Sequence, residues 1–213
     1  MRTANMTEKE LIRRCKKNST KAQKLLYKTY HSSLLGICMR YGKSKAEAED
    51  ILHIGMMKIY KSIGSFSGNG SFEGWMKRII VNTAVDNFRK NHKHYYHENI
   101  DDIGESTDLS DEISDNLAAK DILKTIQQLP AGYRLVFNLY AIEGYSHKEI
   151  ALKLGISEST SKTQLMKARV KLQKMLLSLN ELPENATKAQ PLPVYRNEFK
   201  KDTLVAVDLI TQE

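Results

Sequence analysis

Residues 66–94 constrain the fold more than any other stretch, because a glycine-broken loop there leads into one long segment with helical periodicity. Apolar side chains recur at steps of three and four residues, which is the spacing of the core-facing stripe of an α-helix. That stripe comprises Phe72, Trp75, Met76, Ile79, Ile80 and Thr83, and a second row comprises Val81, Ala84, Val85 and Phe88. The pattern predicts a long helix that is apolar on two sides.

A strip of polar and charged residues lies between these two apolar rows. It contains Arg78, Asn82, Asp86, Arg89 and Lys93, while Asn87 and Lys90 continue the first stripe as polar residues. Asparagine side chains hydrogen-bond to base edges, and arginine and lysine side chains pair with phosphates. The strip is therefore consistent with a nucleic-acid-binding surface, and a solvated helix face is the alternative.

Residues 144–176 have the spacing of a helix-turn-helix motif. Gly155 suits the positive-φ position that ends a first helix, and Ser157 is a good N-cap for a second one. In such a motif the N-terminal part of the second helix enters the major groove of DNA. The residues placed there are Ser157, Glu158, Ser159, Thr160, Lys162 and Thr163, with Gln164, Lys167 and Arg169 further along. A plain helical hairpin is the alternative.

Ser161 departs from this motif, because an aliphatic side chain is usual at its position. We expect its hydroxyl to bond back to the helix backbone. The apolar contacts between the two helices are expected from Ile150, Leu154, Ile156, Leu165, Ala168 and Leu172.

The remaining composition narrows the class of protein. The net charge of +8 over 213 residues favours a polyanionic partner. Cys15 and Cys38 lack metal-ligand spacing, no run of 18 apolar residues occurs, and no signal-peptide core is present. His92, His94 and His97 lie close to Glu98, but no Cys or second carboxylate completes a rigid metal site. No Walker loop or nucleophile–base set indicates an enzyme. We expect a soluble, cytoplasmic, non-catalytic protein without a cofactor.

The chain is predicted to be all-α, with two helical domains joined by a flexible acidic linker. Helical periodicity covers the first domain, residues 7–94, and resumes in the second, residues 117–182. Residues 95–116 are rich in Asp and Glu, as solvated linkers are. Residues 183–213 form a proline-interrupted tail of unknown role, for which a frayed end is the default and a small strand or docking segment the alternative.

The order of these parts resembles the extracytoplasmic-function (ECF) sigma factors of the bacterial sigma-70 family. Three stretches carry the resemblance: AEDILHIGMMKIY at 48–60, SFEGWMKRIIVNTAVDNFRK at 71–90, and LPAGYRLVFNLYAIEGYSHKEIALKLGISESTSKTQL at 129–165. The resemblance implies a sigma region 2-like domain, then a sigma region 4-like domain. It also implies an RNA polymerase sigma factor that binds core enzyme, recognises −10 and −35 promoter elements and promotes DNA melting. A stand-alone helix-turn-helix transcriptional regulator is the alternative.

The family resemblance also assigns roles to residues. On the −10 side it implies DNA binding by Asn69, Arg78, Asn82, Asp86, Asn87, Arg89 and Lys90, and on the −35 side by the second helix of the helix-turn-helix. The loop at 66–71 would capture a flipped base, because Gly68 and Gly70 allow close backbone approach and Asn69 offers a donor and an acceptor. An ordinary glycine-rich turn is the alternative.

Core polymerase is the implied partner of the helix at 45–62. Its first apolar stripe is Leu52, Met56, Ile59 and Ile63, and a second stripe, Ile51, Ile54 and Met57, is expected on nearly the opposite side. A helix this broadly apolar either sits deep in a bundle or lends one side to a partner. The implied contacts are Asp50, Ile51, His53, Ile54 and Met57. An anti-sigma factor is a further partner that the resemblance implies.

Overall fold

In the computed structural model the chain folds into two compact units, and the structure describes residues 6–91 and 123–180. Both units are helical, and no strand occurs within these described ranges. The predicted all-α class is therefore confirmed. Among the described helices, none combines the length and apolar character that crossing a bilayer requires.

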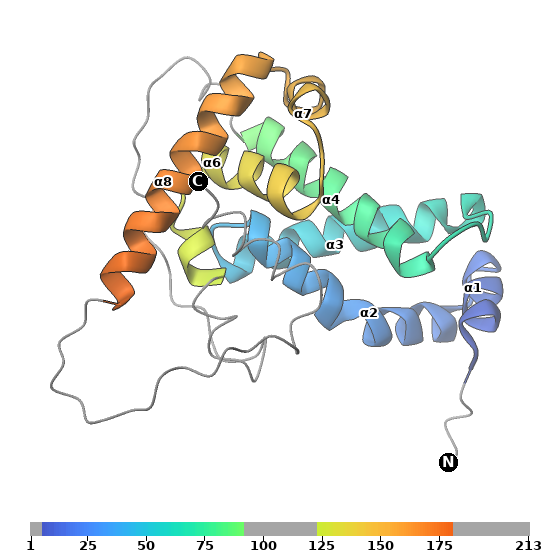
Figure 1. The fold of residues 1–213 in the computed structure, drawn as a ribbon. Coiled ribbons are helices and arrows are strands. Elements are labelled where there is room, and N and C mark those ends of the chain that lie inside the picture. The colour runs from blue at the N-terminus through green and yellow to red at the C-terminus, as the bar shows by residue number, and fades with distance from the viewer. Residues whose placement is uncertain (1–5, 92–122, 181–213) are drawn as a thin grey trace, which may run out of the picture. The chain divides into compact units, whose positions relative to one another are not determined.

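The first unit is a bundle built around three long helices, α2 (Thr20–Tyr41), α3 (Lys45–Ser62) and α4 (Phe72–Asn91). These three helices pack against one another in pairs, as Figure 1 shows. The short helix α1 (Glu8–Lys16) packs on α2 and on the 3-10 turn η1 (Ile63–Ser65). The core lies between the long helices, and its largest fully buried side chains are Leu26, Leu34, Met39, Ile51, Leu52, Ile59, Phe72, Met76 and Ile80.

Both apolar rows predicted for α4 are largely buried. Phe72, Met76, Ile80 and Thr83 are nearly inaccessible on one side, as are Val81, Ala84 and Val85 on the other. Trp75, Ile79 and Phe88 are partly exposed at the margins. Because α4 contacts both α2 and α3, two sides of the helix are covered and the polar strip between them is left at the surface.

The second stripe predicted for α3 is wrong at one position. Ile54 and Met57 are 44% and 47% exposed, whereas Ile51 is buried in the core. The reason is that α3 packs on α2 and on α4 along different sides, so Ile51 lies on a covered side. The exposed face of α3 instead carries Asp50, His53, Ile54, Met57 and Lys61.

The described part of the second unit contains a helical segment at residues 123–127, followed by three further helices (Figure 1). These are α6 (Ala131–Phe137), α7 (His147–Leu154) and α8 (Glu158–Asn180). A π-helical turn, η2 (Asn138–Ile142), extends α6. The core of the second unit is formed by α6 and α7 packing on α8. Its buried side chains include Phe137, Leu139, Ile150, Leu154, Leu165, Ala168 and Leu172.

Local sequence signals account for the turn between α7 and α8. Ser146 and Glu149 form a reciprocal capping box at the start of α7, and Gly155 ends the helix with a φ of 69° in the left-handed region. Ser157 Oγ accepts a hydrogen bond of 3.0 Å from the Thr160 N–H and caps α8. The predicted helix-turn-helix geometry is confirmed. Ile156 is only partly buried, in contrast to the other expected apolar contacts.

Candidate nucleic-acid interface

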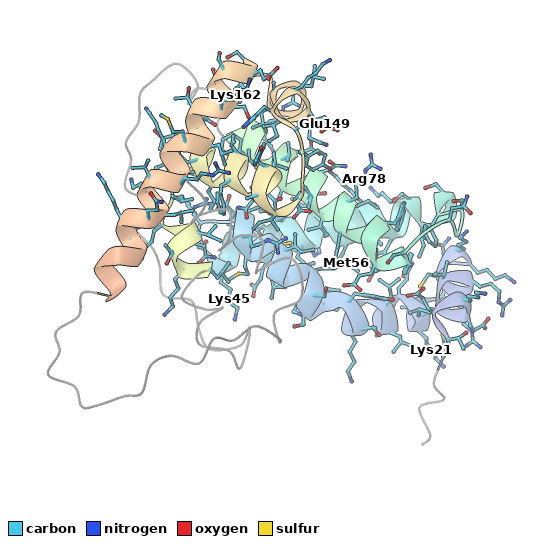
Figure 2. The ribbon with its side chains drawn as sticks, viewed as in Figure 1. Lys21, Lys45, Met56, Arg78, Glu149 and Lys162 are labelled. Carbon is cyan, nitrogen blue, oxygen red and sulfur yellow. The ribbon has the colours of Figure 1, made fainter. Side chains whose placement is uncertain are left out.

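The polar strip of α4 is exposed at several of the predicted positions. Arg78, Asp86, Arg89 and Lys90 are exposed, and Asn82 is half-buried beside them. Figure 2 shows the Arg78 side chain extending away from α4. Lys93, which completes the strip in the sequence, lies outside the described residues, as do His92, His94 and His97. The strip thus presents amide and guanidinium groups together on one helix surface.

Two members of this surface have partners on the preceding helix or its N-terminus, which the sequence did not indicate. Lys58 Nζ of α3 forms a 2.8 Å ion pair with Asp86 Oδ2. Asn87 Nδ2 donates a 3.1 Å hydrogen bond to Glu47 Oε1, and the same side chain of Glu47 accepts from the Lys43 N–H at 2.8 Å. Asp86 and Asn87 therefore contribute to packing between α3 and α4 as well as to the predicted DNA surface.

The loop that precedes α4 is exposed from Ser67 to Ser71. Gly68 and Gly70 have φ values of 86° and 88°, a conformation that side chains with a Cβ rarely adopt. At the end of the loop Ser71 Oγ caps α4 by accepting a 3.1 Å hydrogen bond from the Gly74 N–H. Between the two glycines, Asn69 is at the surface. A short segment with an open backbone and an exposed amide is thereby presented at the N-terminus of α4.

An aromatic cluster supports the base of this loop. Trp75 lies nearly parallel to Phe72, with ring centroids 5.7 Å apart and planes at 14°, and its ring is 5.5 Å from that of Phe66. Because both neighbours are buried, Trp75 contributes to the core even though part of it is exposed. This agrees with the core role favoured by its place in the apolar stripe.

The first turns of α8 carry the polar residues predicted to enter the major groove. Ser157, Glu158, Ser159, Lys162 and Thr163 are exposed, and Thr160 is half-buried. Figure 2 labels Lys162, whose Nζ lies 2.9 Å from Glu158 Oε1, and this contact lowers the pKa of the Glu158 carboxyl. Such a solvent-exposed pair contributes little to stability, so Lys162 can exchange it for a phosphate at little cost.

Two residues expected further along α8 instead turn toward the interior of the second unit. A Cβ at Gly132 of α6 would lie 3.4 Å from Gln164 Nε2, and Gln164 Oε1 is buried. Arg169 also has its Nε buried. Both positions flank the stripe that packs on α6, formed by Ser161, Leu165, Ala168 and Leu172. Lys167 is exposed, with its Nζ 5.9 Å from the centroid of the Tyr133 ring.

Ser161 is fully buried, and its partner differs from the one expected. Its Oγ lies 2.9 Å from Nδ1 of His147, the first residue of α7. The backbone bond expected from the sequence is thus replaced by a contact between the two helices. The sequence did not indicate that these two residues pair, because 14 positions separate them.

Metal binding has no candidate among the residues that the structure describes. No group of three or more His, Cys, Asp or Glu side chains comes together there. Cys15 and Cys38 are both buried, and burial raises the pKa of the Cys38 thiol to about 12. Neither thiol is disposed to act as a thiolate ligand or nucleophile at neutral pH.

Comparison with known proteins identifies both units. The family model "Sigma-70 region 2" matches residues 26–94, and "Sigma-70, region 4" matches residues 119–172. The RNA polymerase sigma-H factor of Pseudomonas aeruginosa is 27% identical over 188 residues, which cover 81% of this chain and 95% of that protein. The ECF RNA polymerase sigma-E factor of Escherichia coli K12 is 28% identical over 175 residues, covering 77% of this chain and 91% of that protein.

A likeness to a solved structure was also found. The sigma factor RpoE of Bartonella quintana, in complex with the anti-sigma factor NepR, is 22% identical with a TM-score of 0.46, covering 72% of this chain and 96% of that one. The two matching regions occur in the order predicted from the sequence and together span more than half of the chain. The chain therefore belongs to the sigma-70 family and is an RNA polymerase sigma factor of the ECF type.

Proposed function

We propose that this sigma factor divides promoter recognition between its two units. In this proposal the first unit, residues 7–94, reads the −10 element through Asn69 and the polar strip of α4. The second unit, residues 117–182, reads the −35 element through the first turns of α8. Residues 95–116 connect the two as an acidic linker, and we assign no role to residues 183–213. The protein carries out no catalysis of its own and acts in the cytoplasm.

The −35 assignment is supported by the exposure of Ser159, Lys162 and Thr163 at the start of α8. The helix N-terminus carries partial positive charge and unpaired N–H groups, which favour a DNA phosphate. Short hydroxyl side chains and a lysine there suit base-edge and backbone contacts in the major groove. Gln164 and Arg169 contribute less to this surface, since both turn partly toward α6.

Core polymerase is assigned to the exposed face of α3. Ile54 and Met57 place two large apolar side chains in water, flanked by Asp50 and His53. Exposed apolar groups rimmed by polar ones are typical of protein interfaces. Ile51 is buried, so it packs in the core of the first unit and does not contact the partner. An anti-sigma factor that covers one of these faces is a further proposed partner, and co-purification from the host would detect it.

The main support for promoter recognition with core enzyme is that both sigma regions occur in one chain. A stand-alone helix-turn-helix regulator would require only the second region, and this alternative is not favoured. Run-off transcription with sigma-free core polymerase on fragments of the host genome tests the proposal. We expect discrete transcripts that require the chain, and weak binding of promoter duplex by the chain alone.

A pair of lysine variants tests the −35 assignment in the same assay. Lys162→Gln removes a charge from the start of α8, and Lys124→Gln removes one from an exposed site in the 123–127 helical segment. We expect only Lys162→Gln to reduce transcription from promoters that depend on their −35 element. Absence of any specific transcript, or tight binding of a palindromic duplex without core enzyme, would contradict the proposed function.

A further inference from the structure

The loop between η1 and α4 starts at Phe66, and the backbone carbonyl of Phe66 accepts a hydrogen bond from a lysine near the start of the chain. Lys16 Nζ donates a 2.7 Å hydrogen bond to the backbone carbonyl of Phe66, across 50 positions of sequence. Lys16 is the last residue of α1, which packs on η1. It also precedes the part of the chain that matches the region 2 family model, residues 26–94.

The ring of Phe66 is also held, by packing against two other aromatic rings. It lies 5.1 Å from the Phe72 ring and 5.5 Å from the Trp75 ring, and the residue is 7% exposed. On the far side of Phe72, Tyr30 makes an edge-on contact at 6.0 Å. Phe66 is therefore held from two directions, by aromatic packing from α4 and by a charged donor from α1.

The position of Lys16 is itself determined by packing. Cys15, its neighbour, is completely buried, and Leu11 one turn earlier is 4% exposed. The other basic residues nearby on α1 are engaged differently, because Arg13 and Arg14 both bind the Glu10 carboxylate at 2.7 and 2.6 Å. Lys16 and Lys17 are both exposed, and Lys17 follows the helix as its C-cap. Lys16 is thus the side chain that α1 directs to the loop.

We propose that Lys16 is a positioning residue for the loop at 66–71. Its bond to the Phe66 carbonyl fixes the start of the loop, while Ser71 fixes the end by capping α4. Between these anchors Gly68 and Gly70 would otherwise have wide conformational freedom, which a bound base must remove. Anchoring both ends reduces the ordering that accompanies binding and so favours capture of an unpaired base. This inference rests on the proposed −10 function of the loop.

The test compares three variants of the full chain, each assembled with core polymerase. Lys16→Met removes the donor at similar side-chain length, Lys16→Arg keeps a charged donor, and Lys17→Met removes the same charge from the adjacent residue. Each holoenzyme is titrated with a premelted promoter DNA and with the same DNA carrying an abasic site, placed in turn at each unpaired −10 position of the non-template strand. The ratio of the two affinities reports base capture and cancels any loss of folded protein, since both probes meet the same preparation.

We expect the wild-type chain to prefer the intact DNA strongly at one position. Lys16→Met should reduce that preference by about five- to tenfold, whereas Lys17→Met and Lys16→Arg should retain most of it. The salt dependence of binding should be the same for Lys16→Met and Lys17→Met, because the proposed role of Lys16 is not a phosphate contact.

Three outcomes would overturn the inference and each has a different meaning. If the wild type prefers the intact probe but Lys16→Met and Lys17→Met give the same ratio of affinities for intact and abasic DNA, Lys16 does not position the loop. The proposed −10 function would be unaffected by that result. A uniform loss of affinity by Lys16→Met for both probes, with a salt slope shallower by about one, would make Lys16 a phosphate contact instead. A wild-type holoenzyme that binds intact and abasic probes equally at every position would refute base capture by the loop itself.

Discussion

His147 Nδ1 and Ser161 Oγ lie 2.9 Å apart, and this contact joins the two helices of the helix-turn-helix. His147 is the first residue of α7, and Ser161 lies on the buried side of α8. The Tyr140 ring stacks on His147 at a centroid distance of 4.5 Å, with the planes at 22°. A polar residue at a buried position of α8 is therefore satisfied by the neighbouring helix. Since Lys162 follows Ser161 directly, the contact also fixes the rotation of the proposed recognition surface.

We expect this pair to be energetically coupled. Ser161→Ala leaves a partly buried imidazole without its partner and should lower the free energy of unfolding of the second unit by about 1–2 kcal/mol. His147→Leu with Ser161→Val replaces both groups by apolar ones and should cost less than the sum of the two single changes. Amide hydrogen exchange of residues 147–175 measures this unit separately. Strictly additive effects in the double-mutant cycle would show that the bond contributes nothing.

The same pair predicts a pH dependence. Burial first, and then the charge of Lys162, lower the pKa of His147 below its ordinary value of 6.5, with Arg169 acting in the same direction and Glu158 opposing. The folded state therefore prefers the neutral imidazole, and the unfolded state binds the proton more readily. The stabilising contribution is complete above the unfolded pKa and is lost as the pH falls through the lower folded value.

Hydrogen exchange of the second unit between about pH 7.5 and about pH 5.5 checks this sign. After correction for the intrinsic exchange rate, the wild-type unit should lose protection toward acid pH. His147→Gln should be less stable overall and show a flatter profile. Glu149 and Glu158 have pKa values lowered by Ser146 and Lys162 respectively, so their protonation falls below this window. Protection that increased toward acid pH would contradict the assignment.

The ends of helices were more predictable from the sequence than the partners of polar side chains. Helix α3 has the bounds expected from its pattern, and Gly155 takes the positive φ that the turn requires. These features depend on neighbours in sequence, namely capping residues and glycine. The two-unit helical fold followed from periodicity, which local spacing alone defines.

The unexpected features all depend on neighbours that are distant in sequence. Ile51 is buried because α2 and α4 cover two sides of α3, which the pattern of one helix does not reveal. Asp86 pairs with Lys58 across 28 positions and Asn87 with Glu47 across 40. A polar residue in a helix strip looks the same in sequence whether it meets DNA, water or another helix. The candidate site could therefore be located from the sequence, but the internal contacts of its members could not.

Gly55 is a packing requirement between α3 and α4. A Cβ there would collide with Cδ1 of Ile80, which is fully buried, whereas a Cβ at Gly36 of α2 would meet open space. Alanine favours a helix over glycine by about 1 kcal/mol at either position. We expect Gly36→Ala to stabilise the first unit by about 0.5–1 kcal/mol, and overpacking of about 1–3 kcal/mol to make Gly55→Ala destabilising or at best neutral.

The single tryptophan of the chain, Trp75, lies in the first unit and reports its urea unfolding by fluorescence. The comparison of Gly36→Ala with Gly55→Ala isolates packing, since both changes add one methyl group to a helix. Equal stabilisation by the two variants would show that Ile80 moves aside without cost and that α3 and α4 do not require glycine at their contact.

The strip on α4 leads to the sharpest prediction about DNA. Arg89 is exposed near the end of the helix, as a phosphate contact would be, and Asn82 is half-buried one turn after Arg78, where its amide would face bases. Arg89→Ala should weaken holoenzyme binding uniformly across −10 sequences and make the salt slope shallower by about one. Asn82→Ala should change the preference at one base, by about 1–3 kcal/mol, and leave the salt slope unchanged.

Lys24→Ala, at an exposed site on α2, is the control for removing a positive charge from the first unit. Binding is measured with the assembled holoenzyme against DNA probes that differ at single −10 positions and over a range of salt concentrations. Because α4 packs through its apolar rows, neither Arg89→Ala nor Asn82→Ala should abolish folding, and Trp75 fluorescence verifies this. An Asn82→Ala variant that weakened all probes equally would exclude base reading by Asn82, and the strip would then hold DNA through its backbone alone.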